Sequence, residues 1–216
     1  MVSFISRSQM YFFERMHRYI SVPIVKSLAE TKITPNMVTI TNFILAAINS
    51  YLLFNNKLSI VSAVLMFMYY FLDVVDGNLA RCTGKTSKLG ATLDKVGDDL
   101  FYNIFLITLG FNRVPLVILC IVLFLHNIYG VAATYYIVPN IRKIKDFKRA
   151  GLKKYFMDKG IILGMDISLL NVLIIFAIIS RQYAAVYVFI MILYIADILY
   201  RFIELWVNQY IDRQRK

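Results

Sequence analysis

Five of the 13 acidic residues of this chain fall in one stretch, at Asp73, Asp76, Asp94, Asp98 and Asp99. Residues three or four positions apart share one face of a helix, so Asp73 and Asp76 would lie on a common face. Asp94 and Asp98 would share a face of a second helix for the same reason. Asp99 would point about 100° away from Asp98, which leaves it outside the set. Two antiparallel helices joined by a short connection would therefore aim four carboxylates at one pocket.

These four carboxylates predict a site for a divalent cation. Four negative charges in a poorly hydrated pocket cannot all stay ionised unless a cation compensates them. Because no histidine or cysteine stands among them, the ligands are hard oxygens, which suit Mg²⁺ or Mn²⁺ better than zinc. Paired divalent ions held by carboxylates serve phosphoryl-group chemistry. The alternative is that the aspartates simply pair with nearby basic residues, namely Arg81, Lys85, Lys88 and Lys95.

Small and basic residues accompany the aspartates at matching positions. Gly77 and Ala80 fall on the predicted face of the first two aspartates, and Gly90 lies one turn before the third. Such small side chains leave room for a flat ligand or another backbone. Arg81 adds a planar guanidinium, whose fork of donors suits a phosphate.

The composition indicates that the helices carrying these residues cross a membrane. The chain has 216 residues, of which 59% are hydrophobic and 17% charged, and its mean hydropathy is +0.64. A soluble domain would be about half apolar and about a quarter charged. The two cysteines, Cys82 and Cys120, give neither a disulfide framework nor a metal-binding spacing.

We expect an all-α integral membrane protein with six transmembrane helices. A helix needs roughly 20 apolar residues to cross the hydrocarbon core, where its backbone polar groups must be satisfied internally. The segments that meet this requirement are residues 37–54, 58–75, 93–111, 114–138, 161–179 and 183–206. Thr34 and Pro35 suit the cap and first position of the first of these helices.

An amphipathic helix is expected before the first span, over residues 8–30, because apolar residues recur there at helical spacing among basic ones. It would lie at the cytoplasmic membrane surface; the alternative is a soluble helix packed on the bundle. The chain would thus divide into an N-terminal interfacial segment, residues 1–36, and a membrane domain, residues 37–216.

The basic residues predict the orientation. The chain has 24 Lys and Arg against 13 Asp and Glu, a net charge of +11. Only Lys57, Arg113 and Arg181 fall in the odd-numbered connections, and the other 21 lie near the termini and the even-numbered connections. We expect the protein to lie in the cytoplasmic (inner) membrane. By the positive-inside rule, both termini and the aspartate pocket would face the cytoplasm. The charge therefore needs no nucleic-acid partner.

Several other polar residues have two interpretations. The eight basic residues between 142 and 159 could set the orientation in the membrane and contact anionic lipid. Alternatively, one or two of them could bind a phosphate group of a substrate. Asp197 and Arg201 can pair four residues apart. Asp166 has no such local partner, so it could face the central cavity and contact a polar acceptor. His126 is expected to form a hydrogen bond between helices.

The stretch from Asp73 reads DVVDGNLARCTGKTSKLGATLDKVGD, which follows the pattern D-x2-D-G-x2-A-R-x8-G-x3-D-x3-D. This pattern resembles the signature of the CDP-alcohol phosphotransferases, with every fixed position filled. The six spans, the N-terminal helix and the PNMVT opening of the first span are also similar to that family, over nearly the whole chain. The lead-in SRSQMYFFERMHRYISVPIVKSLAETKITPN further resembles the branch that contains di-inositol-phosphate-phosphate synthase domains.

The resemblance implies a role for each matching residue. Asp73, Asp76 and Asp94 would hold two metal ions, and Asp98 would complete the site and act as general base on the acceptor hydroxyl. The residues implied to contact the CDP part, or to leave room for it, are Asn36, Thr39, Gly77, Ala80, Arg81, Ser87 and Gly90.

The implied reaction is attack of an alcohol hydroxyl on the phosphoryl group of a CDP-linked donor, with release of CMP. We expect CDP-diacylglycerol as the donor, a polar alcohol as the acceptor, a phospholipid as the product and a homodimer, as is usual for the family. One alternative keeps this chemistry with a polar donor such as CDP-inositol and an inositol-phosphate-type acceptor. A divalent-cation transporter is a different alternative, but its acidic residues would be distributed along the spans rather than gathered at one side.

Overall fold

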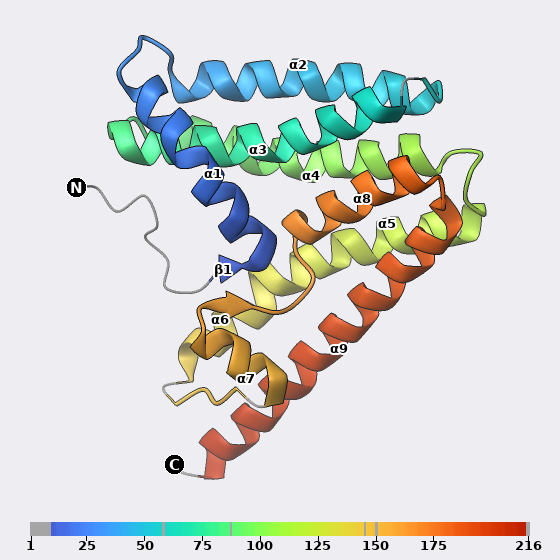
Figure 1. Cartoon of the computed structure of the whole chain (residues 1–216). Coiled ribbons are helices and arrows are strands. Elements are labelled where there is room, and N and C mark those ends of the chain that lie inside the picture. The colour runs from blue at the N-terminus through green and yellow to red at the C-terminus, as the bar shows by residue number, and fades with distance from the viewer. Residues whose placement is uncertain (1–9, 58, 87, 145, 150, 215–216) are drawn as a thin grey trace.

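Figure 1 shows the computed structural model, which describes residues 10–57, 59–86, 88–144, 146–149 and 151–214. The elements in chain order are β1 (Met10–Tyr11), α1 (Phe12–Ala29), α2 (Pro35–Phe54), α3 (Ser59–Thr83), α4 (Lys88–Gly110), α5 (Leu116–Val131), the π-helix η1 (Ala132–Ile137), α6 (Val138–Lys143), α7 (Gly151–Asp158), β2 (Ile161–Ile162), α8 (Ile167–Ser180) and α9 (Tyr183–Gln214). The predicted helical class is confirmed, with one short pair of strands as the exception.

Four helical stretches in the described part of the chain are long and apolar enough to cross a membrane: Pro35–Phe54, Ser59–Thr83, Leu116–Lys143 and Tyr183–Gln214. The protein is therefore an integral membrane protein. The expected span 93–111 corresponds to α4, which carries three aspartates, and the expected span 161–179 corresponds to α8, which has 14 residues. A helix of that length is about 21 Å long, against about 30 Å of hydrocarbon. The total of six spans stays a prediction.

The start of α2 agrees with the sequence. Thr34 has extended backbone and accepts a hydrogen bond from the Met37 amide, and Pro35 occupies the first helical turn. The cap satisfies an amide that has no partner within the helix. The adjacent helix α1 covers most of the expected segment 8–30, but Met10 and Tyr11 form β1 instead.

The expected helix over 161–179 is wrong at its start. Ile161 and Ile162 form β2, which pairs in parallel with β1 through Met10 and Tyr11. Two glycines prevent an earlier helix, because Gly160 has φ 78° and Gly164 has φ 153°, values that favour glycine. A Cβ atom on Gly164 would also lie 2.9 Å from the Asp197 carboxylate and from the Arg201 guanidinium.

The expected span 114–138 stays helical but widens at its end, where α5 passes into the π-helix η1. Pro139 follows directly, in α6. A proline ring clashes with the carbonyl group four residues earlier, here Tyr135, and its missing amide breaks the regular pattern. A wider π-turn accommodates both effects.

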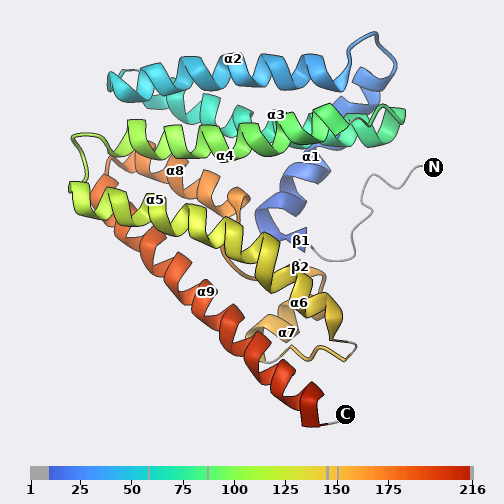
Figure 2. The ribbon, with the colours of Figure 1, turned by 180° about the vertical axis from the view of Figure 1, so that it is seen from behind.

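The helix α3 is central to the packing. The helices α1, α2 and α8 all contact it, and α2 also contacts α4 (Figures 1 and 2). Buried asparagines fix two of these contacts, because Asn42 donates to the Tyr69 carbonyl and Asn171 to the Met66 carbonyl. The helix α9 packs on α5 and runs obliquely away from the layer formed by α2, α3 and α4 (Figure 1). This arrangement holds the acidic stretch between several helices.

Candidate active site

Three of the predicted carboxylates come together between α3 and α4. Asp73 and Asp76 on α3 and Asp94 on α4 each place a carboxylate oxygen within 4.8 Å of the others. Their depth differs, since Asp76 is buried at 4% exposure while Asp94 is exposed. An all-oxygen set of this kind fits a hard divalent cation such as Mg²⁺ or Mn²⁺.

Asp98 lies one helical turn beyond Asp94 and outside this group of three. The Tyr69 hydroxyl lies 3.4 Å from its Oδ1 atom. Asp98 nevertheless lines the same large cavity as Asp73 and Asp94. Asp99, which the helix geometry excluded, also reaches the wall of that cavity. Asp76 does not line that cavity, so three of the four predicted carboxylates border it rather than all four.

Thr39 has a role that the sequence reasoning missed. Its hydroxyl lies 2.6 Å from Oδ2 of Asp76 and 3.1 Å from the Pro35 carbonyl oxygen. A hydrogen bond from Thr39 to Asp76 orients that carboxylate and links α2 to the acidic group. The resemblance had placed Thr39 only beside a nucleotide, and no spacing within α2 indicates a bond to a residue on α3.

Two cavities meet at the carboxylates. The smaller one has a volume of about 150 Å³ and the larger one about 700 Å³, which is within the range of small-molecule sites. Gly77, Arg81 and Asp94 line both. The walls of the larger cavity come from β1, α1, α3, α4, α5, η1, α6, α8 and α9 and from the segment just before α8.

The smaller cavity gathers the residues that the resemblance assigned to CDP. Its lining includes Asn36, Thr39, Gly77, Ala80, Arg81 and Gly90. Ser87, the remaining residue of that set, lies outside the described residues. The Arg81 guanidinium lies over Gly77, where a Cβ atom would be 3.3 Å from Nη2. The absence of a side chain at Gly77 thus lets the guanidinium approach the helix backbone.

Arg81 belongs to a hydrogen-bonded group that reaches α1. Its Nη2 atom donates to Oδ1 of Asn78 at 2.8 Å, and Nη1 of Arg18 donates to the same oxygen at 2.9 Å. Arg18 and Arg81 both line the larger cavity. The sequence reasoning counted Arg18 only toward topology, and Asn78 occupies a variable position of the signature.

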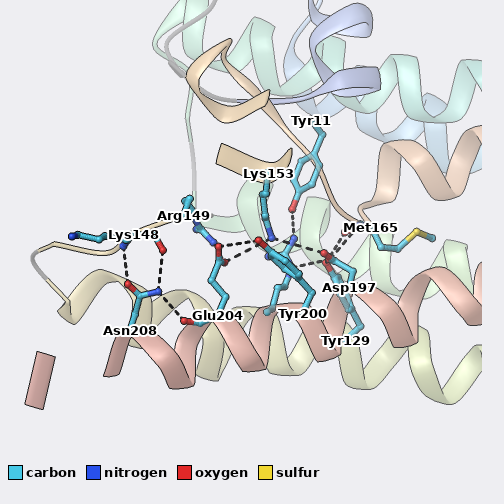
Figure 3. A network of polar contacts seen from close by, with 11 residues as sticks. Tyr11, Tyr129, Lys148, Arg149, Lys153, Met165, Asp197, Tyr200, Glu204 and Asn208 are labelled. Carbon is cyan, nitrogen blue, oxygen red and sulfur yellow. Dashed lines mark hydrogen bonds and ion pairs between the residues drawn. The ribbon is translucent and has the colours of Figure 1, made fainter. Parts of the chain in front are cut away.

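A polar network lies along one side of α9 (Figure 3), and some of its residues line the larger cavity. The expected pair is present, with Arg201 Nε donating to Asp197 Oδ2 at 2.8 Å. Arg201 also donates to the Tyr11 hydroxyl at 2.8 Å. Tyr129 donates to Asp197, and the Met165 amide lies 3.2 Å from the same carboxylate. Tyr11, Tyr129 and Arg201 line the cavity.

Two residues of the basic stretch 142–159 point into this network rather than toward lipid or water. Arg149 pairs with Glu204. The Lys153 Nζ atom lies 4.0 Å from carboxylate oxygens of Asp197 and Glu204 and has no hydrogen-bond partner among the described residues. Burial lowers the pKa of Lys153 to about 8, and the nearby arginines add to that effect.

Two further expectations can be compared with the structure. His126 is within 2.8 Å of the Tyr194 hydroxyl, which confirms a hydrogen bond between α5 and α9. The expectation that Asp166 lacks a local partner is wrong. Asp166 caps α8 and accepts from the Ser168 hydroxyl at 2.6 Å and from the Ser168 and Leu169 amides, while it also lines the larger cavity. The local partner follows from the helix beginning at Ile167 instead of 161.

Known proteins share parts of this sequence and its fold. An archaetidylinositol phosphate synthase of Pyrococcus horikoshii is 42% identical over 75 residues, which are 35% of this chain and 39% of that protein. A phosphatidylinositol phosphate synthase of Corynebacterium glutamicum is 36% identical over 76 residues, 35% of each chain. A bifunctional IPC transferase and DIPP synthase of Thermococcus kodakarensis is 32% identical over 100 residues, 46% of this chain and 22% of that one. The matches thus span well under half the length of these relatives.

The fold is similar to that of a Mycobacterium tuberculosis phosphatidylinositol phosphate synthase (PgsA1), whose crystal structure holds CDP-DAG. The TM-score is 0.59 at 18% sequence identity, over 87% of this chain and 94% of that one. The sequence pattern that defines the CDP-alcohol phosphatidyltransferases matches residues 32–207, which include three of the four helices that could cross a membrane in full and the fourth, α9, up to residue 207. This chain therefore belongs to the CDP-alcohol phosphatidyltransferase family.

Proposed function

We propose that this protein is a membrane enzyme that transfers a substituted phosphate group from a CDP-linked donor to the hydroxyl group of a polar alcohol and releases CMP. One observation carries the proposal: Asp73, Asp76 and Asp94 converge where the two cavities meet. One cavity would take the cytidine part of the donor and the other the acceptor. Membership of the family supports this reaction class.

The three converging carboxylates would hold two divalent cations, either Mg²⁺ or Mn²⁺. When bound, such ions neutralise the diphosphate and stabilise CMP as it leaves. Thr39 would orient Asp76 through its 2.6 Å hydrogen bond. Arg81, which lines both cavities, would donate to the phosphate oxygens.

Asp98 would act as the general base. It lines the larger cavity but lies outside the group of three, so its carboxylate is available to the acceptor. The acceptor oxygen would bond to the donor phosphorus while Asp98 takes its proton. The bond between that phosphorus and the bridging oxygen would break, and its electron pair would leave with CMP. No covalent enzyme intermediate is needed.

For the substrates we infer CDP-diacylglycerol as donor and an inositol-phosphate-type alcohol as acceptor. The names of two relatives and the lipid in the PgsA1 structure support this choice. Arg201 lines the larger cavity and could donate to the phosphate of such an acceptor. The second candidate is a CDP-inositol donor, which the third relative and the lead-in sequence favour.

We propose the same arrangement in the membrane that the sequence predicts. The helices α4 and α8 would complete a set of six spans, and α1 would lie at the cytoplasmic surface, with both termini and the site on that side. The division into residues 1–36 and 37–216 and the homodimer belong to this proposal. The charge distribution supports the orientation.

The test is an assay of the purified full chain in lipid nanodiscs. Labelled CDP-diacylglycerol or CDP-inositol is supplied with inositol phosphate, inositol or glycerol phosphate, and CMP and the labelled product are measured. We expect CMP release that depends on both donor and acceptor and stops after exhaustive chelation. Turnover that survives chelation would refute the metal site, and no CMP release from any pair would refute the reaction.

A further inference from the structure

We propose that Arg18 of α1 is a further binding residue for the phosphate groups of the CDP-linked donor, and that Asn78 positions Arg18 beside Arg81 for this purpose. The inference rests on the proposed function. It adds α1 to the binding site, although α1 lies outside the signature that runs from Asp73 to Asp98. The geometry of four side chains carries it.

The first step is that one oxygen atom holds both guanidiniums. Arg18 Nη1 and Arg81 Nη2 donate to Asn78 Oδ1 at 2.9 and 2.8 Å. Asn78 is buried, at 3% exposure, and both arginines line the larger cavity. Two flexible cations from helices far apart in the sequence thus meet at one wall.

The second step is that Ser21 fixes the direction of the Asn78 amide. The Ser21 hydroxyl donates to the Arg18 carbonyl oxygen at 2.8 Å, so its oxygen can accept from Asn78 Nδ2 at 2.9 Å. An amide turned the other way would present N–H groups to both arginines and lose three bonds. The hydrogen-bond pattern therefore determines which end of Asn78 faces the arginines.

The third step concerns the donors that Arg18 still has. Glu14 accepts from its Nε atom at 3.0 Å and Asn78 from Nη1. A guanidinium has five N–H groups, and within the described part of the chain the Arg18 Nη2 atom makes no hydrogen bond. Two guanidiniums at one wall suit an anion with several acceptor oxygens. Arg81 also lines the smaller cavity, which the proposed function assigns to the cytidine part of the donor. The donor diphosphate is therefore the phosphate source that can reach both Arg18 and Arg81.

Attraction of α1 to anionic lipid is the competing explanation for Arg18. Its side chain is only 14% exposed and faces Asn78, which does not fit a lipid-facing role. Arg15 provides a matched control on the same helix. It lies over the Tyr19 ring, donates to the Lys159 carbonyl oxygen at 3.4 Å and lines neither cavity.

The experiment compares Arg18→Gln with Arg15→Gln in nanodiscs, with KM for CDP-diacylglycerol, KM for the acceptor, and kcat measured separately. Charge-assisted hydrogen bonds contribute enough that we expect Arg18→Gln to raise the donor KM roughly tenfold. The acceptor KM should stay within about twofold for the same variant. Arg15→Gln should leave both KM values within about twofold of the original chain. Direct titration with CDP measures binding without turnover.

Two more variants test the positioning role of Asn78 without removing it. Ser21→Ala releases the amide and should raise the donor KM in the same direction, by less than Arg18→Gln. Arg18→Lys keeps the charge but cannot contact Glu14 and Asn78 together, so it should restore only part of the affinity. Thermal unfolding of each variant identifies those that fold poorly.

The outcomes separate this inference from the proposed function. If the unchanged protein turns over no CDP-linked donor, the proposed function fails first. If it turns over normally and Arg18→Gln behaves like Arg15→Gln, the inference is refuted. A rise confined to the acceptor KM would also refute it, because the phosphate at Arg18 would then belong to the acceptor. Full recovery in Arg18→Lys would overturn the fixed geometry.

Discussion

Asp76 and Asp98 have different surroundings, and these suit different tasks. Asp76 is buried and receives the Thr39 hydroxyl at 2.6 Å, which fixes the direction of its oxygens. Asp98 has the Tyr69 hydroxyl at a longer 3.4 Å and borders the larger cavity. A rigid carboxylate favours a ligand role, while a carboxylate beside open space can accept a proton from a substrate.

We predict that Asp98→Asn abolishes turnover while donor binding survives, whereas Asp73→Asn loses both. Asp73 belongs to the group that would hold the ions, and those ions would hold the diphosphate of the donor. A general base typically contributes roughly 10²–10⁴-fold to the rate. CMP release reports turnover, and titration with CDP reports donor binding. Near-normal turnover in Asp98→Asn would mean that another group takes the proton.

We predict that Thr39→Val weakens activation by Mg²⁺, because Asp76 loses the bond that orients it. Partners of metal ligands usually contribute about 10–100-fold to metal affinity or activity. The matched control is Thr41→Val on the same helix, since the Thr41 hydroxyl bonds the Met37 carbonyl of its own helix and, among the described residues, no other group. Activity against Mg²⁺ concentration measures the effect. Equal curves for the two variants would remove Thr39 from the site.

The helices α2 and α4 approach each other closely at one glycine. A Cβ atom on Gly97 would lie 2.4 Å from the Phe43 ring. Gly97 stands between Asp94 and Asp98, so the same contact sets how α4 presents its carboxylates. Helix packing in membranes depends on small residues at such points.

We predict that Gly97→Ala destabilises the protein by about 1–3 kcal/mol, the usual cost of overpacking. Gly130→Ala is the control, because Gly130 lies in a helix with nothing within 4 Å of an added Cβ atom. It should be neutral or stabilise by up to about 1 kcal/mol. Thermal unfolding in detergent compares them, and Phe43→Leu should recover part of the loss in the double variant. If Gly97→Ala unfolds like the Gly130 control, α2 and α4 are not in close contact.

Apolar runs and spacing predicted most of the elements and the meeting of Asp73, Asp76 and Asp94. The turns at Gly160 and Gly164 are not visible in the hydrophobic pattern, because Gly160 directly precedes the predicted span 161–179 and Gly164 stands among its apolar residues. Contacts between distant segments, such as Arg18 with Asn78 and Thr39 with Asp76, were also missed. Such contacts depend on how helices pack, which no local pattern specifies.

At the scale of the whole molecule, the proposed mechanism depends on the orientation in the membrane. Donors made from CTP arise in the cytoplasm, so the proposed function requires cavities that open on that side. The connection after α3 and the basic stretch 142–159 would share that side with the cavities. The connection between α2 and α3 would lie on the other side.

We predict the labelling pattern of single cysteines in a background that lacks Cys82 and Cys120. Cysteines at Lys85 and Lys148 should resist a membrane-impermeant thiol reagent in intact cells and react after permeabilisation. A cysteine at Asn56 should react in intact cells. Labelling of the Lys85 position in intact cells would reverse the orientation and exclude a cytoplasmic donor.

The pairing of β1 with β2 connects two parts of the chain that are far apart in the sequence. It joins Met10 and Tyr11 to Ile161 and Ile162, and Tyr11 also holds Arg201. The segment that carries Lys153 is thus anchored at a point set by residues near the start of the sequence. A bulky fusion placed just before Met10 would strain this pairing and disturb the contact of Tyr11 with Arg201 at the wall of the larger cavity, far along the chain from the insertion. Purification tags should therefore be attached at the C-terminal end, beyond α9.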